Sequence, residues 1–370
     1  MVDNSRAVTG AVNAMRHATG PLREQFRFAY VLPTGSAARP LLEADGYRVH
    51  ELPFVEISRR KADLLRYLPM LLLNGWRLRR LARREGAQVI HLNDFYNLTG
   101  YVARMISFGK LCVVTHVRFL PQSLPQPLAR TWRWLAEQGA DQVVCVSGAV
   151  RRYFGGAARV QIIYDPLPGT ERHPAAMHPA RPNGTVHCLY LSNYIQGKGQ
   201  DLALAAFQRA YAKDGRLRLQ FVGGDMGMEK NRLFREQLEA RVLAAGLQAV
   251  VSFAGFVADV EQAIKAADVL LNFSESESFS LTCLDALYYG TPLIASDCGG
   301  PAELFENDRS GRLVPNRDVP AMAAAINQMA ADAGLRERFA AAGRAYVRQK
   351  FAPAGTYEKL GALYAAVLRR

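Results

Sequence analysis

Short apolar runs alternate with longer helical patterns along this chain, and the alternation occurs twice. The runs lie at residues 28–32, 89–92, 111–115 and 142–147, and then at 188–192, 217–222, 250–253, 269–273 and 292–296. Continuous apolar runs rich in β-branched residues are typical of parallel strands that are covered on both faces. The pattern therefore predicts an α/β fold in which parallel strands lie between helices.

A break separates the two sets of runs. Residues 165–184 are dense in proline and glycine, which is typical of a linker. A length of 370 residues also suits two domains better than one. We predict two Rossmann-like, doubly wound domains that face each other across a cleft, with bounds 1–168 and 186–355 and a linker at 169–185. Such sheets bind ligands beyond the carboxyl ends of their strands.

The start of the first domain is irregular. A first strand is expected just before the helix that begins near Gly10, yet only Met1 and Val2 precede the polar residues 3–6. Either this strand is very short, or the sequence begins downstream of the natural start. The second alternative is the preferred one.

The cysteines and the apolar segments bear on location. Five scattered cysteines lie mostly in apolar runs, as Cys145 does within 143–146. This placement predicts reduced core thiols and a cytoplasmic protein. The residues at the N-terminus lack the apolar stretch of a signal peptide, and no run reaches the roughly 18 apolar residues of a spanning helix. We therefore expect a protein that is neither exported nor membrane-spanning.

The charge is uneven. Residues 1–175 hold 24 Lys+Arg and 13 Asp+Glu, whereas residues 176–370 hold 22 and 20. A basic half suits anionic lipid, an acidic substrate or nucleic acid, although no nucleic-acid-binding module is recognisable. Residues 71–84 combine Trp76 with five arginines. They predict either an interfacial helix at the inner membrane face or a core-packed helix with a solvated basic face.

Two acidic residues follow the run that ends at Phe273. Glu277 lies in a loop of small residues, and Asp285 lies eight positions further, within the next helical pattern. A strand, a loop and a helix N-terminus form an anion site because unpaired N–H groups and the helix dipole face the ligand. A diphosphate fits there, with the carboxylates accepting hydrogen bonds from sugar and ribose hydroxyls. The alternative is a surface loop with a capping Ser280 and incidental acids.

Two further glycine-containing loops are candidates for ligand contact. Lys198 lies between two glycines after the run 188–192, where its ammonium can reach a phosphate. A solvated loop lysine is the commoner alternative. The turn at 297–303 contains Gly299 and Gly300, and it can either approach a ligand closely or serve as a plain connection.

Together these segments, from about Cys188 to Phe351, resemble the C-terminal half of retaining glycosyltransferases of family 4, which have the GT-B fold. The family's Glu-x7-Glu signature matches residues 277–285, with Asp285 in place of the second glutamate. The resemblance implies that Glu277 contacts the donor sugar and Asp285 the ribose. The family's paired Arg and Lys on the diphosphate correspond to Asn193 and Lys198, of which only the lysine is kept.

The same resemblance implies the other site residues. The donor contacts comprise the glycine turn, the segment lining the base and the loop amides: Gly224, Phe256, Ser278, Phe279, Ser280, Leu281 and Thr282. The N-terminal half is similar more loosely, through residues 90–94, 114–118 and 144–147. It implies that His116 lies near the reacting sugar, that Gly10 approaches the donor phosphates and that Arg118 is the acceptor contact. The C-terminal helix at 356–370 is implied to return to the first domain.

The resemblance implies a retaining, metal-independent transfer of a hexose-type sugar from a UDP- or GDP-sugar to a glycan or lipid-linked acceptor, as in surface polysaccharide, lipopolysaccharide or glycolipid assembly. No Asp-x-Asp metal pair occurs and no cofactor is expected. Lys198, the loop amides and the helix dipole are expected to stabilise the departing phosphate instead. Two alternatives remain: a nucleotide-sugar epimerase of the same fold, and a non-catalytic nucleotide-sugar binder.

Overall fold

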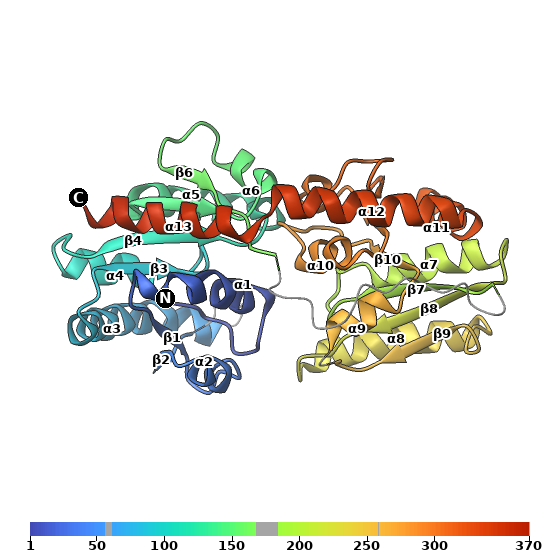
Figure 1. The fold of residues 1–370 in the computed structure, drawn as a ribbon. Helices are drawn as coiled ribbons and strands as arrows, with labels where there is room; N and C mark the ends of the chain where they lie inside the picture. The colour runs from blue at the N-terminus through green and yellow to red at the C-terminus, as the bar shows by residue number, and fades with distance from the viewer. Residues whose placement is uncertain (56–60, 168–183, 258, 370) are drawn as a thin grey trace. The chain divides into compact units, whose positions relative to one another are not determined.

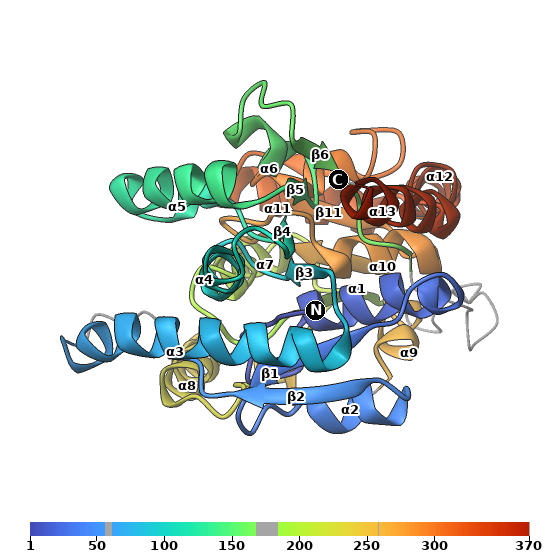
Figure 2. The ribbon, with the colours of Figure 1, turned by 90° about the vertical axis from the view of Figure 1, so that its left-hand side faces the viewer.

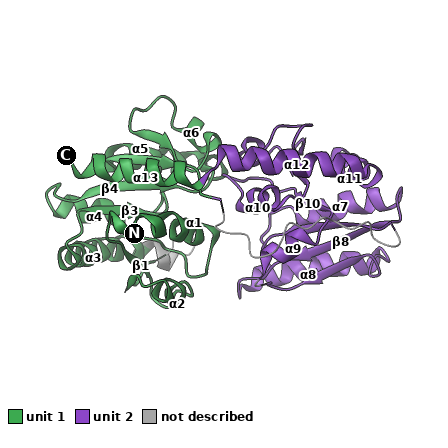
Figure 3. Ribbon diagram, in the orientation of Figure 1, with its two compact units in different colours: residues 1–166, 353–370 green, residues 167–352 purple. Residues whose placement is uncertain are grey.

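The computed structural model describes residues 1–55, 61–167, 184–257 and 259–369. The chain forms two compact units, which Figure 3 shows in different colours. Unit 1 comprises residues 1–166 and 353–370, and unit 2 comprises residues 167–352. Most of the predicted linker 169–185 lies outside the described residues.

Unit 1 is built on parallel strands with helices between them (Figure 1). Its strands are β1 (Ala29–Pro33), β2 (Arg48–Leu52), β3 (Val89–Leu92), β4 (Cys112–Val117), β5 (Gln142–Cys145) and β6 (Val160–Ile162). Its helices are α1 (Gly10–Thr19), η1 (Gly20–Glu24), α2 (Arg39–Ala44), α3 (Lys61–Glu85), α4 (Thr99–Ile106), η2 (Pro121–Ser123), α5 (Gln126–Gly139), α6 (Gly148–Tyr153) and α13 (Pro353–Leu368).

Val2 connects the pair β1-β2 with the sheet β3-β4-β5-β6. It forms parallel bridges to Val31 on one side and to Leu92 on the other. Its N–H donates to the carbonyl of His91 at 2.8 Å. A very short first strand, one of the two alternatives from the sequence, therefore occupies the position between β1 and β3.

Helix α3 packs against α4 within unit 1 (Figure 2). The contact requires a glycine, because a Cβ on Gly75 would lie 2.3 Å from a side-chain carbon of Val102. The predicted helix at 71–84 is present but begins earlier, at Lys61. The sequence hid this extension because Pro69 lies inside the helix, and proline usually ends one.

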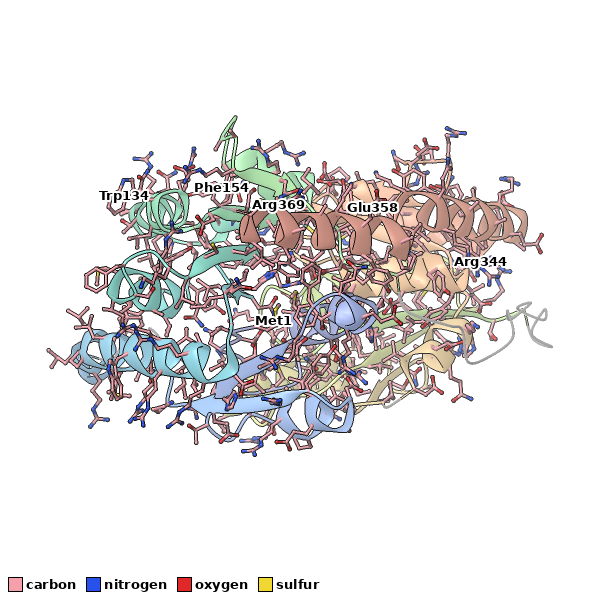
Figure 4. The ribbon with its side chains drawn as sticks, turned by 60° about the vertical axis from the view of Figure 1, so that its left-hand side comes forward. Met1, Trp134, Phe154, Arg344, Glu358 and Arg369 are labelled. Atoms are coloured by element: carbon pink, nitrogen blue, oxygen red, sulfur yellow. The ribbon has the colours of Figure 1, made fainter. Side chains whose placement is uncertain are left out.

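Helix α13 is part of unit 1 (Figure 3). Its buried side chains, including Leu360 and Tyr364, join a cluster with Leu22 and Val144. The Thr356 hydroxyl also donates to the carbonyl of Tyr164 at 2.9 Å. Helix α5 has one buried and one exposed side, and Trp134 lies on the exposed side (Figure 4).

Unit 2 has one parallel sheet of strand order β12-β11-β10-β7-β8-β9. Its strands are β7 (Val186–Leu191), β8 (Leu217–Val222), β9 (Val251–Ala254), β10 (Val269–Asn272), β11 (Leu293–Ser296) and β12 (Arg312–Val314). Its helices are α7 (Gln200–Tyr211), α8 (Glu229–Ala244), α9 (Val260–Lys265), α10 (Leu281–Tyr289), η3 (Gly300–Glu303), α11 (Val319–Ala331) and α12 (Ala333–Lys350).

The core of unit 2 lies between this sheet and its helices. Buried side chains such as Phe221, Leu271, Phe207 and Met322 belong to one cluster that strands and helices share. The predicted α/β fold with parallel strands is confirmed in both units. Strands β2, β6 and β12 were not predicted: β2 mixes polar with apolar residues, and β6 and β12 have only three residues each. No helix in the described ranges is both long and apolar enough to cross a membrane.

Candidate functional site

The loops after β7 and β10 meet at the carboxyl edge of the unit 2 sheet, where these two strands are neighbours. A Cβ on Gly199 would lie 2.0 Å from the carbonyl oxygen of Phe273. Gly199 also has a φ of +82°, which side chains larger than hydrogen rarely adopt. Gly199 therefore lets the loop that carries Lys198 (the lysine loop) lie directly against the loop that carries Glu277 (the acidic loop).

Lys198 and Glu277 form an ion pair across these two loops. The Nζ atom of Lys198 lies 2.7 Å from Oε1 of Glu277. Burial by itself lowers the pKa of Lys198, but the charge and hydrogen bond of Glu277 outweigh this effect and hold the pKa above its ordinary value. The hydroxyl of Ser274 donates to the same Glu277 oxygen at 3.0 Å. The site thus presents a fixed positive charge beside a fixed carboxylate.

The backbone of Glu277 is held by the glycine-rich turn after β11. The Glu277 N–H donates to the carbonyl of Cys298, and the Gly300 N–H donates to the carbonyl of Glu277 at 2.7 Å. A Cβ on Gly300 would lie 2.3 Å from the nitrogen of Phe279, so this turn has room only for glycine. Of the two alternatives for the turn at 297–303, the structure shows a close approach to the acidic loop itself.

Helix α10 begins directly after this loop. Ser280, with a φ of +77°, accepts a hydrogen bond from the N–H of Cys283 and one from the side chain of Asn272. A helix start leaves its first N–H groups, here Leu281 and Thr282, without partners inside the helix. These amides and the dipole of α10 favour an anion beside the Lys198–Glu277 pair.

Asn193 and Phe256 lie near the glycine turn after β8. The side-chain oxygen of Asn193 accepts a hydrogen bond from the Gly224 N–H at 3.2 Å. The Phe256 ring is 81% exposed, and its Cβ lies 3.8 Å from where a Cβ on Gly224 would be. Asn193 therefore supports the turn, while Phe256 offers an open aromatic face for stacking.

Asp285 lies on α10, where most of the residue is buried and only a part of it is exposed. Burial raises its pKa to about 7. No hydrogen bond to its carboxylate is present among the described residues. The carboxylate is therefore available to accept bonds from ligand hydroxyls when it is ionised.

The remaining predicted residues lie in unit 1. Gly10 is the exposed first residue of α1, and the side chain of Thr9 caps this helix. His116 is buried at the end of β4, and burial followed by the charge of Arg118 lowers its pKa well below the ordinary value. It is therefore a neutral imidazole. Its Nε2 atom has no hydrogen-bond partner among the residues that the structure describes.

Arg118 has strong partners of its own. Its guanidinium donates to both carboxylate oxygens of Asp165, at 2.6 and 2.8 Å, and to the side-chain oxygen of Asn93 at 2.6 Å. Only 5% of the side chain is exposed. This geometry joins the ends of three chain segments and leaves little of the guanidinium open to an acceptor.

Ser274 and Asn272 also support the site, and neither was predicted from the sequence. Asn272 carried a signal, since a polar residue at the end of the apolar run 269–273 is unusual. Ser274 carried none, because serines are common in loops. In the described part of the chain, no group of three or more His, Cys, Asp or Glu residues could hold a metal ion.

Two family models match the chain, one in each half. The model described as Glycosyltransferase Family 4 matches residues 15–167, and the model described as Glycosyl transferases group 1 matches residues 178–346. The predicted resemblance to family 4 is therefore confirmed.

Relatives of known activity match parts of the chain. A lipopolysaccharide core biosynthesis mannosyltransferase of Rhizobium leguminosarum bv. viciae is 33% identical over 135 residues, which are 36% of this chain and 38% of that protein. The chain thus spans little more than a third of the length of this relative. A D-inositol 3-phosphate glycosyltransferase of a Nocardioides species is 26% identical over 83% of this chain and 74% of that protein.

Solved structures match the whole fold. The crystal structure of Anabaena HepE in complex with UDP and glucose has a TM-score of 0.82 at 21% identity, and the match covers 98% of both chains. Each half of the chain thus matches a glycosyltransferase family model, and the whole chain has the same fold as these solved structures, GT-B.

Proposed function

We propose that this protein is a retaining, metal-independent transferase that moves a hexose-type sugar from a UDP- or GDP-sugar to a glycan or lipid-linked acceptor. The observation that carries the proposal is the Lys198–Glu277 pair, 2.7 Å apart beside the start of α10. The cation and the helix N-terminus suit the diphosphate of a nucleotide sugar, and the carboxylate suits the hydroxyls of its sugar. The HepE structure, which holds UDP and glucose, supports this donor class.

The reaction breaks the bond between the anomeric carbon and the diphosphate oxygen, and the electron pair leaves with the phosphate. Lys198, the Leu281 and Thr282 amides and the dipole of α10 stabilise the negative charge that develops there. The acceptor hydroxyl attacks the same face of the anomeric carbon, and its proton passes to the departing phosphate. Retention of configuration follows, and no separate base is needed.

Glu277 has a different part in this reaction. Without a donor its carboxylate neutralises Lys198. A bound diphosphate provides Lys198 with a second anionic partner, and Glu277 then accepts a hydrogen bond from a sugar hydroxyl. Asp285 accepts bonds from the ribose, and Phe256 stacks on the base. We propose that His116 lies beside the donor sugar and Gly10 beside the donor phosphates. Arg118 acts indirectly, by holding Asn93 and Asp165 at the acceptor side.

The acceptor is proposed from charge and from relatives. The relative that acts in lipopolysaccharide core biosynthesis supports a glycan built on a lipid. The excess of basic residues in the first half of the chain suits a phosphorylated or lipid-anchored acceptor. Surface polysaccharide or lipopolysaccharide assembly at the inner face of the membrane is the proposed setting.

A transfer assay tests the proposal. The protein is incubated with UDP- and GDP-hexoses and a lipid-linked glycan, and the release of nucleoside diphosphate and the anomeric configuration of the product are measured. We expect a product with the donor's configuration, and little product from a Glu277→Gln variant. An inverted product contradicts retention. An altered donor sugar without any acceptor supports the epimerase, and nucleotide binding without turnover supports the non-catalytic binder.

A further inference from the structure

Helix α3 has an unusual outer face. Leu65, Leu68, Leu72 and Trp76 are 78%, 60%, 49% and 48% exposed. The spacing of three and four residues places them on one side of the helix. The adjoining side of the helix packs into unit 1 through Gly75, Leu78 and Ala82. A soluble helix normally buries its leucines and exposes polar residues, but the described residues of unit 1 leave this face uncovered.

The same face continues into arginines. Arg80 and Arg83 follow Trp76 at the same helical spacing, and Arg84 flanks them. The three are without an ion pair to any described residue, and Arg80 lies 5.7 Å from the centre of the Trp76 ring. We call Leu65, Leu68, Leu72, Trp76, Arg80 and Arg83 the α3 stripe. A tryptophan and leucines beside cations are characteristic of helices that lie in a membrane interface.

The whole net charge of the chain lies in the unit that carries this stripe. Unit 1 holds 26 Lys+Arg and 13 Asp+Glu, whereas unit 2 holds 20 of each. We propose that the α3 stripe docks unit 1 on a membrane that contains anionic lipid, with the leucines and Trp76 in the interface and the arginines on lipid phosphates. The proposal deepens the lipid-linked acceptor proposed above, because it assigns the surface that would bring the enzyme to such an acceptor.

Charge decides between a lipid surface and a second copy of this chain. Residues 65–84 contain no Asp or Glu. A second α3 stripe therefore offers no carboxylate to the arginines of the first, and the two sets of cations repel each other. Anionic headgroups supply the missing negative charge, and each arginine near such a surface contributes about a fivefold gain in binding.

Sedimentation of the full chain with vesicles tests the proposal. Wild-type protein should bind phosphatidylglycerol–phosphatidylcholine vesicles more tightly than phosphatidylcholine vesicles, and added salt should reduce this preference. The triple variant Arg80→Gln, Arg83→Gln, Arg84→Gln should bind anionic vesicles about a hundredfold more weakly. The double variant Leu68→Gln, Leu72→Gln should lose binding as well, because apolar burial in the interface is removed.

Matched controls lie on exposed positions of unit 2. The triple variant Arg241→Gln, Arg309→Gln, Arg338→Gln removes the same charge, and the double variant Leu233→Gln, Leu243→Gln removes two leucines of similar exposure. Both should bind vesicles like the wild type. Circular dichroism melting curves establish that every variant is folded.

Three results overturn the proposal. One is equal binding of wild-type protein to anionic and neutral vesicles at low salt. Another is equal weakening by the α3 and control triples. The third is a dimer in sedimentation velocity that the Leu68→Gln, Leu72→Gln variant dissociates. Transfer to a water-soluble acceptor should be unchanged in the α3 variants, so a failure of docking is distinguishable from a failure of the proposed reaction.

Discussion

Lys198 and Glu277 are 79 residues apart in sequence and 2.7 Å apart in the structure. The sequence predicted each as a donor ligand, from glycines around the lysine and from the small residues before a helix. Their mutual ion pair was not predictable, because it depends on β7 and β10 being neighbours in the sheet. Asn193 shows the same limit. The position of Asn193 after β7 was predictable from the sequence, but its hydrogen bond to the Gly224 N–H depends on the conformation of the turn after β8.

Removal of the Lys198 charge should slow transfer. We expect Lys198→Ala to lower kcat by about a hundredfold or more, since one electrostatic donor to the transition state has that effect. Lys198→Arg, which keeps the charge, should recover part of the rate. The exposed Lys213 provides the control, because Lys213→Ala changes no residue of the site. An unchanged kcat in Lys198→Ala would show that another group carries the departing phosphate.

Asp285 should make stability depend on pH. Burial raises its pKa to about 7 in the folded chain, against an ordinary value of 3.8. The folded state therefore binds this proton more tightly, and the stability it contributes is present below the unfolded pKa and is lost as pH rises through about 7. Asp285→Asn lacks this proton. Between about pH 5 and pH 8, urea unfolding should show the wild type losing about 1 kcal/mol or more relative to the variant. If the free energies of unfolding of the wild type and Asp285→Asn changed equally with pH, the raised pKa of Asp285 would be contradicted.

Among the elements, the mainly apolar strands of unit 2 were the most predictable. β7, β8, β10 and β11 lie within a residue or two of the apolar runs because both of their faces are covered. Short β6 and β12 have no such pattern. Helix α3 was predicted only from residue 71, since Pro69 concealed the turns before it.

The lysine loop before α7 offers a test at this scale. Gly197→Ala and Gly199→Ala both place a side chain at positive φ, which costs about 1–2 kcal/mol. Only at Gly199 does the new Cβ meet backbone, 2.0 Å from the Phe273 oxygen, whereas nothing lies within 4 Å at Gly197. Gly199→Ala should therefore lower the free energy of unfolding by at least about 2 kcal/mol more than Gly197→Ala in urea titrations. Equal losses would mean that the two loops do not touch in solution.

For the whole molecule, two parallel α/β units were predictable from the repeated alternation and the proline-rich break. The identity of the donor and of the acceptor was not, because these depend on a few side chains that differ among proteins of one fold. The charge asymmetry was visible in the sequence, but its complete assignment to unit 1 required the return of α13 to that unit.

Removal of metal ions tests whether the proposed transfer depends on a divalent cation. The proposed stabilisation comes from Lys198, amides and a helix dipole, so transfer should continue after dialysis against EDTA. Initial rates before dialysis, after dialysis and after addition of Mg²⁺ or Mn²⁺ should agree within about twofold. A loss of activity that only a divalent cation restores would contradict a metal-independent reaction.

The central claim is that a nucleoside diphosphate binds beside Lys198 and the start of α10. Thermal unfolding with UDP, GDP and ADP measures this directly, because a ligand of the folded state raises Tm. We predict that at least one diphosphate raises the Tm of the wild type and of Lys213→Ala, and that the rise is much smaller in Lys198→Ala. A wild type that no diphosphate stabilises, or a Lys198→Ala variant with an undiminished rise, would contradict the account.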